Sequence, residues 1–320
     1  MEGVLDFTQR DRVTRLPGWD FCVTEFVRVS QGRLPRRVFH RYAPELLNDS
    51  RTPAGVPVEV QLLGSDPDAM AENAQAAVAA GVQHLDLNFG CPAKTVNRHQ
   101  GGAVLLQTPE RVHQIAAAVV QAVAASGVPV SAKMRLGYAD RCLALDNAWA
   151  LQAAGVKRLV VHARTRMEAY RPPAHWEWVG YIADSLHIPV LANGDLWTLA
   201  DYQRCVGVSG VRDVMLGRAA MADPWLAAQI KASASGQTAF VPQWADLLHW
   251  LADSLLASAS VYPEKNRIMR VKQWLLMVQP RWGQVARDFF EQIKRLQSEV
   301  QLLAALQAVQ RPTQVLTDQR

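Results

Sequence analysis

The sequence has few cysteines, no long apolar run and no basic, apolar leader at its start. Its 320 residues include four cysteines, which form no Cys-x-x-Cys pair. A disulfide framework and a zinc site are therefore not expected. Apolar stretches such as Ile115–Val120 are far shorter than the roughly 20 residues that a membrane-spanning helix needs. We expect a cytoplasmic protein with no membrane attachment and no bound metal.

Positive charge is distributed unevenly. The formal net charge is +5. From Lys265 to the C-terminus there are ten Lys/Arg and four Asp/Glu, whereas the preceding 264 residues carry 24 and 25. A basic segment beside a neutral one indicates a polyanionic partner. The alternative is a solvated helical face that is richer in Lys and Arg than usual.

Short β-rich apolar runs alternate with Ala-rich helical stretches between residues 20 and 220. The predicted strands are Phe21–Val27, Val58–Leu63, His84–Phe89, Val128–Met134, Arg158–His162, Ile188–Asn193 and Asp213–Leu216. The predicted helices between them are Ala69–Ala80, Pro109–Ala125, Leu143–Ala154, Trp176–Ser185 and Leu199–Val206. This alternation is typical of a parallel sheet covered by helices.

Seven predicted strands favour a TIM (β/α)8 barrel, an α/β fold of eight strands, whose first strand would precede Met1. We therefore expect that the natural chain starts upstream of this methionine. The alternative is an open doubly wound sheet, which is disfavoured because no GxGxxG turn follows an early strand.

The alternation of strand and helix patterns ends near residue 235, and only helical patterns follow it. Helices are predicted from Pro242 onward and over Lys265–Val278, Gln284–Gln297 and Val300–Gln310. We predict a barrel domain over residues 1–238 and a small all-helical domain over residues 239–320 that contains the basic segment.

Polar side chains recur where the predicted strands end. They are Glu25, Arg28, Gln61, Asn88, Cys91, Lys133, Arg135, His162, Arg164, Asn193, Asp195 and Arg218. Barrel enzymes place their chemistry at these ends. Asn193-Gly194 and Gly217-Arg218 follow the last two strands, where a phosphate site is common, so a phosphate-bearing ligand is expected. Lys133 could bind an anion or form a Schiff base.

Cys91 differs from the other three cysteines. It lies between Gly90 and Pro92, in a turn directly after a predicted strand. Its thiol is therefore expected to be partly exposed, and Lys94 and Arg98 are close enough in sequence to influence it. Cys22, Cys142 and Cys205 are interpreted as structural residues.

Several segments together resemble the tRNA-dihydrouridine synthases. They are Met1-Glu2-Gly3-Val4, Thr24-Glu25-Phe26-Val27-Arg28, Val60-Gln61-Leu62-Leu63-Gly64, Asp86-Leu87-Asn88-Phe89-Gly90-Cys91-Pro92-Ala93-Lys94, Lys133-Met134-Arg135-Leu136-Gly137, His162-Ala163-Arg164-Thr165, Asn193-Gly194-Asp195 and Gly217-Arg218. Phe39-His40-Arg41 and Arg270-Val271-Lys272-Gln273-Trp274 are similar to subgroup C of that family, which acts on uridine 16 of the tRNA D loop.

The resemblance implies a flavin-bearing barrel followed by a tRNA-binding helical domain, in a monomer without an obligatory protein partner. It implies that NADPH or NADH reduces FMN and that Cys91 is the general acid. The implied FMN-binding residues are Met1, Glu2, Gln61, Lys133, His162, Asn193, Gly194, Asp195, Gly217 and Arg218. The implied tRNA-binding residues are Arg28, Asn88, Tyr170, Arg270, Lys272 and Lys294.

The general-acid role implied for Cys91 needs a protonated thiol. An unperturbed cysteine, with a pKa of ~8.5, is mostly protonated at neutral pH. Three other functions remain open: a flavin barrel that reduces free pyrimidines or enones, a Schiff-base lyase that uses Lys133, and a tRNA-binding protein without catalysis. The basic C-terminal segment disfavours the first. A flavin spectrum would separate the enzymes that carry flavin from the other two.

Overall fold

The structure, a computed structural model, describes residues 5–30 and 32–309 and divides into two compact units. The first unit comprises residues 1–15 and 19–217, and the second comprises residues 16–18 and 218–320. No helix within the described ranges is both long enough and apolar enough to cross a membrane.

A curled parallel sheet forms the centre of the first unit. Its strands are β1 (Cys22–Val23), β2 (Val27–Arg28), β3 (Val58–Leu63), β4 (Leu85–Phe89), β5 (Val130–Arg135), β6 (Leu159–His162) and β7 (Val190–Asn193). Their order is β1-β3-β4-β5-β6-β7, and β2 also pairs with β3. Every pairing is parallel, as the alternating sequence pattern predicts.

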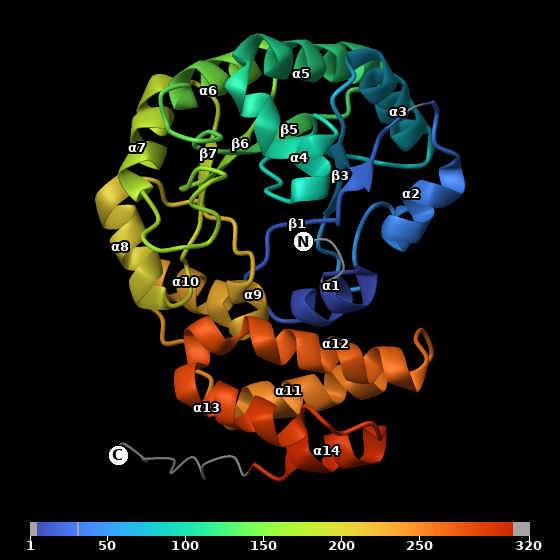
Figure 1. The fold of residues 1–320 in the computed structure, drawn as a ribbon, viewed down its shortest axis with the longest axis vertical. Coiled ribbons are helices and arrows are strands. Elements are labelled where there is room, and N and C mark those ends of the chain that lie inside the picture. The colour runs from blue at the N-terminus through green and yellow to red at the C-terminus, as the bar shows by residue number, and fades with distance from the viewer. Residues whose placement is uncertain (1–4, 31, 310–320) are drawn as a thin grey trace. The chain divides into compact units, whose positions relative to one another are not determined.

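Helices make up most of the remaining regular structure described in the first unit. They are α1 (Phe7–Thr14), α2 (Arg36–Tyr42), α3 (Pro67–Ala79), α4 (Lys94–Arg98), α5 (Pro109–Val123), α6 (Ala144–Ala153), α7 (Trp176–Ser185) and α8 (Leu199–Ser209). Three short 3-10 helices occupy Pro44–Leu47, Gly102–Gln107 and Ala124–Ser126. In Figure 1, α3, α5, α6, α7 and α8 form an outer arc around the strands, which is the layering of a TIM barrel.

Two of the predicted strands are modified because side chains replace backbone partners. Phe21–Val27 is predicted as one strand, but the structure has β1 and β2 there. Between them, the hydroxyl of Thr24 accepts a hydrogen bond from the Gln61 peptide N–H at 3.1 Å. The run Asp213–Leu216 forms only a parallel bridge between Val214 and Ala192. Within the described part of the sheet, β1 and this bridge are the two ends of an open arc.

Alternation along β4 separates two kinds of side chain. Leu85, Leu87 and Phe89 are buried in the same apolar cluster as Met70 of α3 and Ile115 of α5. Burying one such side chain stabilises a fold by about 1.5–3 kcal/mol. Asp86 and Asn88 alternate with the apolar residues and therefore face the other side of the sheet. The outer layer supplies the apolar core, which leaves the inner face free for polar groups.

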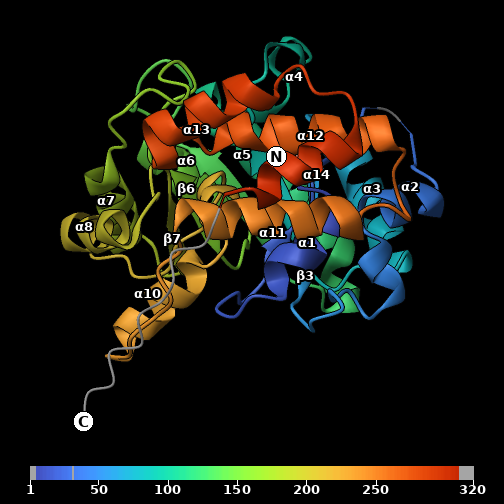
Figure 2. The ribbon, with the colours of Figure 1, turned by 90° about the horizontal axis from the view of Figure 1, so that it is seen from below.

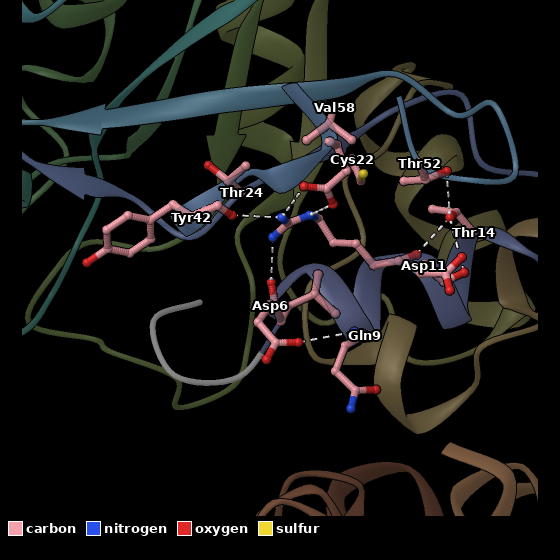
Figure 3. A network of polar contacts seen from close by, with 12 residues as sticks. Asp6, Gln9, Asp11, Thr14, Cys22, Thr24, Tyr42, Thr52 and Val58 are labelled. Carbon is pink, nitrogen blue, oxygen red and sulfur yellow. Dashed lines mark hydrogen bonds and ion pairs between the residues drawn. The ribbon is translucent and has the colours of Figure 1, made fainter. Parts of the chain in front are cut away.

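Helix α1 is fixed by a buried ion pair (Figure 3). Arg10 donates to both carboxylate oxygens of Glu45 at 2.8 Å, and it also donates to the carbonyl oxygens of Tyr42 and Leu5 at 2.8 and 3.2 Å. The hydroxyl of Thr14 donates to that of Thr52 at 3.0 Å, and the two residues point toward each other in the close-up. These contacts hold a polar helix that the sequence pattern did not predict.

The second unit is helical. Its helices are α9 (Ala219–Ala222), α10 (Leu226–Ala234), α11 (Trp244–Ala257), α12 (Glu264–Met277), α13 (Gln279–Ile293) and α14 (Glu299–Gln307). The last four correspond to the four helices predicted after residue 242. Figure 2 shows α11, α12 and α14 side by side. Helix α13 starts earlier than predicted, because two helical segments join at Gly283, whose φ of 57° is left-handed.

Aromatic side chains fill the interior of the second unit. The rings of Trp250 and Trp274 lie 5.1 Å apart, and those of Trp244 and Trp282 lie 5.5 Å apart. Two indole N–H groups also have partners: Trp274 donates to the carbonyl oxygen of Met221 at 2.8 Å, and Trp282 donates to that of Ala222 at 2.7 Å. Both contacts join the C-terminal helices to α9 within this unit.

Candidate active site

The strand register of the first unit places polar residues side by side. Gln61 of β3 pairs with Asp86 of β4, and Asp86 pairs with Ser131 of β5. Two residues further along, Asn88 pairs with Lys133. Since partners in a parallel sheet point to the same face, these five side chains share the inner face of the barrel.

A chain of hydrogen bonds joins four of these residues. The Ser131 hydroxyl donates to Asp86 Oδ1 at 2.7 Å, and Gln61 Nε2 donates to Asp86 Oδ2 at 2.6 Å. Asn88 Nδ2 then donates to Gln61 Oε1 at 2.7 Å. Asn88 Oδ1 accepts from the peptide N–H of Cys91 at 2.9 Å. We call these four side chains and the Cys91 peptide N–H the amide chain.

Cys91 lies in a tightly held turn directly after β4. Asn88 Oδ1 also accepts from the peptide N–H of Gly90 at 3.0 Å. The Cys91 carbonyl oxygen accepts from Asn97 Nδ2 at 2.9 Å and from the Ala103 N–H at 3.1 Å. Gly102 has a φ of +68°, and a Cβ there would lie 2.8 Å from the Cys91 carbonyl oxygen. The backbone of Cys91 is therefore fixed from three sides, and its side chain is partly exposed.

Lys133 and Asn193 meet across the inner face. Lys133 Nζ donates to Asn193 Oδ1 at 3.0 Å, and Asn193 Nδ2 donates to the carbonyl oxygen of Met215 at 2.7 Å. Loss of hydration and, to a smaller extent, the nearby Arg135 lower the pKa of Lys133 to about 7, although Asp86 opposes the shift. A neutral amine and an ammonium are thus both accessible to Lys133 near neutral pH.

The loops after β6 and β7 approach each other closely. Gly194 has a φ of +114°, and a Cβ there would lie 2.8 Å from His162 Cδ2. Glycine lets the backbone come this near to the imidazole. Asp195, also left-handed with a φ of 55°, forms an ion pair with the fully buried Arg164. The buried Arg164 thereby holds the turn Asn193-Gly194-Asp195 in place through Asp195.

Arg135 ties the Cys91 turn to the loop that contains Tyr170. Its Nε donates to the Gly90 carbonyl oxygen at 3.0 Å, and Nη1 donates to the carbonyl oxygens of Thr165 and Ala169 at 2.9 Å. Its guanidinium lies over the Tyr170 ring, 5.4 Å from the centroid. Tyr170 itself is half exposed and lies 6.1 Å from the His162 ring.

The other cysteines differ from Cys91 in their surroundings. Burial raises the pKa of Cys22 to about 12 and that of Cys205 to about 11. Cys142 is exposed in the turn before α6, where a hydrogen bond to Asp140 raises its pKa. Within the described residues, no group of three or more His, Cys, Asp or Glu is arranged to hold a metal ion.

The structure brings together Gln61, Asn88, Cys91, Lys133, His162, Asn193 and Gly194 in the first unit, along with Asp195 and Tyr170. Arg28, at the end of β2, is exposed. Gly217 is the last residue of the first unit, and Arg218 begins the longer segment of the second, residues 218–320. Met1 and Glu2 lie outside the described residues.

Three basic residues of the second unit lie in the middle of α12 and directly after α13. Lys272 Nζ donates to the carbonyl oxygens of Lys294 and Leu296 at 2.9 and 2.5 Å, which places it beside Lys294. Lys294 forms an ion pair with Glu291. Arg270 lies over the ring of Tyr262 at 4.6 Å from the centroid. Their charges remain at the surface of a helical unit with an aromatic interior.

Sequence reasoning did not single out Asp86, Ser131 and Asn97. Asp86 and Asn88 are two residues apart on a strand, and that spacing could have identified Asp86 as an inward residue. No comparable signal marks Ser131, whose importance follows from its pairing with β4, or Asn97, which contacts Cys91 through the fold of the following loop.

The fold and the polar groups at its strand ends define a protein of the TIM-barrel class. Residues 1–312 match the family model described as Dihydrouridine synthase (Dus). The chain is 47% identical over 313 residues to the tRNA-dihydrouridine(16) synthase of Ralstonia nicotianae, covering 96% of this chain and 93% of that protein. It is 48% identical over 291 residues to the protein of the same name from Aquipseudomonas alcaligenes, covering 91% and 92%.

A third relative of that name, from Cupriavidus necator, is 45% identical over 309 residues, covering 97% of this chain and 95% of the relative. The chain therefore belongs to the dihydrouridine synthase family, and the resemblance found in its sequence is confirmed.

Proposed function

We propose that this protein reduces a uridine of tRNA, at position 16 of the D loop, to 5,6-dihydrouridine. The observation that carries the proposal is its identity of 45–48% to three proteins named tRNA-dihydrouridine(16) synthase, over nearly the whole chain. The position of Cys91 beside the polar inner face of the barrel supports it. We further propose that the protein acts in the cytoplasm as a monomer.

FMN is the proposed cofactor, and the chemistry of the available donors fits it. The described candidates are Gln61, Lys133, His162, Asn193, Gly194, Asp195, Gly217 and Arg218, together with Met1 and Glu2 at the start of the chain. They offer amide, imidazole and cationic donors, which suit the carbonyl and phosphate oxygens of a flavin nucleotide. Gly194 leaves its peptide open to close approach, since a Cβ there would already meet His162 at 2.8 Å.

When bound, FMN that has been reduced by NADPH or NADH supplies the hydride that saturates C6 of the uracil ring. The protein then has to deliver a proton to C5. Cys91 is the proposed general acid, because its turn is held by Asn88 while its side chain remains partly exposed. Lys133, His162 and Asn88 are the proposed hydrogen-bond partners of the uracil or flavin carbonyls, where they would stabilise developing negative charge.

The target base has to leave its RNA loop to reach the inner face of a barrel. Arg28, Asn88 and Tyr170 of the first unit, and Arg270, Lys272 and Lys294 of the second, are the proposed tRNA contacts. Basic side chains at the surface bind phosphates and fix the orientation of the RNA. We propose residues 1–238 as the catalytic domain and residues 239–320 as the tRNA-binding domain.

Mapping of dihydrouridine in tRNA from a host strain that lacks this protein tests the proposal. Position 16 should change to unmodified uridine, and the purified full chain with NADPH should restore dihydrouridine there. The purified protein should also show the visible absorption of bound flavin. Retention of dihydrouridine 16 in the deletion strain, or a colourless protein that binds tRNA without reducing it, would contradict the proposal.

A further inference from the structure

The amide chain is oriented from both of its ends. At the inner end, both carboxylate oxygens of Asp86 accept hydrogen bonds, one from Ser131 and one from Gln61. At the outer end, the peptide N–H groups of Gly90 and Cys91 can only donate. Each side-chain amide between them has one face that donates and one that accepts.

Because both ends of the amide chain are fixed, the side-chain amides of Gln61 and Asn88 can each be turned in only one way. Gln61 has to turn its NH2 group toward the carboxylate, so its oxygen faces Asn88. Asn88 then turns its own NH2 group toward Gln61 and its oxygen toward the peptide N–H of Cys91. A side-chain amide is assigned by its hydrogen bonds, and here the two ends give the same assignment.

We propose that Asp86 is a positioning residue that sets the orientation of Gln61 and Asn88 and, through them, the turn that carries Cys91. Its importance for catalysis rests on the proposed role of Cys91 as the general acid. Asp86 touches neither Cys91 nor, in this arrangement, a substrate, and it acts only through the two intervening amides.

Placing a carboxylate here is costly for the fold. Asp86 is fully buried, and the loss of hydration raises its pKa. The hydrogen bonds from Ser131 and Gln61 and the positive charges of Arg158 and Lys133 favour the ionised form. A neutral amide of the same shape would avoid the burial of a charge. It would, however, present a donor either to the NH2 group of Gln61 or to the hydroxyl of Ser131. That hydroxyl already accepts from Arg158 Nη2 at 3.3 Å, and its own proton would be left with the Leu85 carbonyl oxygen at 3.4 Å, so either placement weakens the chain.

Asp86→Asn is therefore expected to disturb a distant pair of peptide groups. If Gln61 turns over to satisfy the amide introduced at position 86, its NH2 group meets that of Asn88. If Asn88 turns over in response, it presents NH2 to the N–H groups of Gly90 and Cys91. Either mismatch removes one hydrogen bond from the chain, and the weakest point is the turn at its outer end.

Residue-resolved hydrogen exchange on the full chain, with flavin content matched across variants, tests this inference. In Asp86→Asn the amides of Gly90 and Cys91 should exchange about fivefold to tenfold faster than in the parent protein, as expected for the loss of one hydrogen bond. Amides of β6, on the far side of β5, should change little. Unchanged exchange at Gly90 and Cys91 would overturn the proposal.

Glu59→Gln is the matched control. Glu59 is also a buried carboxylate, on β3 two residues before Gln61, but its partners are Arg158 and His84. The same acid-to-amide change at this position should leave the exchange of Gly90 and Cys91 as in the parent protein. Equal acceleration in both variants would mean a general loosening of the barrel and would overturn the specific role of Asp86.

A charge-shifted double variant, Asp86→Asn with Gln61→Glu, provides the rescue. The amide introduced at position 86 can accept from Ser131 and donate to the carboxylate introduced at position 61. That carboxylate can in turn accept from Asn88. Slow exchange at Cys91 should return, although the single variants lose it. If Asp86→Asn does not fold, recovery of a folded protein by Gln61→Glu becomes the measurement, and no recovery overturns the proposal.

The exchange experiment separates this inference from the proposed function. It reports on the Cys91 turn whether or not the protein reduces uridine. Should Cys91→Ala retain full dihydrouridine formation, the proposed acid would be wrong while the exchange pattern could still hold. If Asp86→Asn leaves the exchange of Gly90 and Cys91 unchanged while Cys91→Ala is inactive, the positioning role would be wrong and the function would stand.

Discussion

The interiors of the two units differ in kind. The first unit buries ionisable side chains such as Glu59, Asp86 and Arg164 in or directly after its strands. The second packs Trp244, Trp250, Trp274 and Trp282 against one another, and Asp223 is the one ionisable side chain that is buried among its described residues. Its described basic side chains are half-buried or exposed.

This difference suits two roles: the interior of the first unit can hold a reacting group, and the cations of the second can attract a polyanion. Buried polar groups are expensive, and a fold retains them where a reacting group has to be held in one orientation. Surface cations cost little and attract a polyanion over a distance. Four variants can break or sharpen the contrast, and we order them from the largest expected effect to the smallest.

Cys91→Ala tests whether the first unit carries the chemistry. Loss of a general acid should lower dihydrouridine formation by on the order of 10²–10⁴-fold. Oxidation of NADPH by the flavin should continue, because that step does not use the thiol. Cys142→Ala, which removes an exposed thiol, is the control and should keep parental turnover. Turnover by Cys91→Ala at the parental rate would refute the assignment.

Arg10→Met tests how strongly the first unit depends on a buried charge. It leaves Glu45 without its partner, and loss of one member of a buried pair costs about 3–5 kcal/mol of unfolding free energy. Arg15→Met, which breaks an exposed pair with Asp11 at the end of the same helix, should cost only about 0–1 kcal/mol. Urea unfolding measures both, and equal losses would contradict the argument.

Lys133→Met tests the penalty for a buried ammonium. The unfolded chain holds the Lys133 proton up to its ordinary pKa of 10.5, whereas the folded protein releases it near 7. Between these values the unfolded state binds more protons, so this group makes stability rise with pH, and below pH 7 the full penalty applies. The variant should therefore be more stable than the parent by about 2–4 kcal/mol at pH 6.

That advantage should shrink as the pH approaches 9, because the parent protein then folds with a neutral amine. Urea unfolding of flavin-free protein at pH 6, 7.5 and 9 would follow it. Lys157→Met, which replaces an exposed lysine just before β6, should show no such trend. A pH-independent difference for Lys133→Met would count against the lowered pKa.

Arg270→Ala combined with Lys272→Ala tests the surface cations of the second unit. Affinity for tRNA should fall about tenfold, and the slope of its logarithm against log salt should decrease by between one and two. Filter binding over a salt series measures both values, with Lys157→Ala as the control. NADPH oxidation should persist. An unchanged slope would remove these residues from the proposed interface.

Strongly patterned elements were predictable from the sequence. The strand Val58–Leu63 and the helix Trp176–Ser185 occur with the predicted bounds. Helix α1 was not predicted, because Phe7–Thr14 has almost no apolar periodicity and is held by Asp6 at its N-terminus and by the distant Glu45. The last strand is reduced to one bridge, because the Asn193 side chain takes the carbonyl of Met215.

The members of the site were predictable, but their contacts were not. Cys91, Lys133 and Asn193 follow or end predicted strands, so a barrel brings them to one edge. The hydrogen bond between Lys133 and Asn193 spans 60 residues and depends on the curvature of three strands. Asp86 was part of a recognised motif, but its action through Gln61 requires the register of β3 against β4.

The two-residue spacing of Asp86 and Asn88 also limits how this gene can change in length. One residue inserted between Leu85 and Asp86 would turn both polar side chains into the apolar layer and bring Leu87 and Phe89 to the inner face. Insertions at the exposed residues Arg98–Gln100 shift no strand register. We expect insertion scanning to find a strict boundary between these two neighbouring segments.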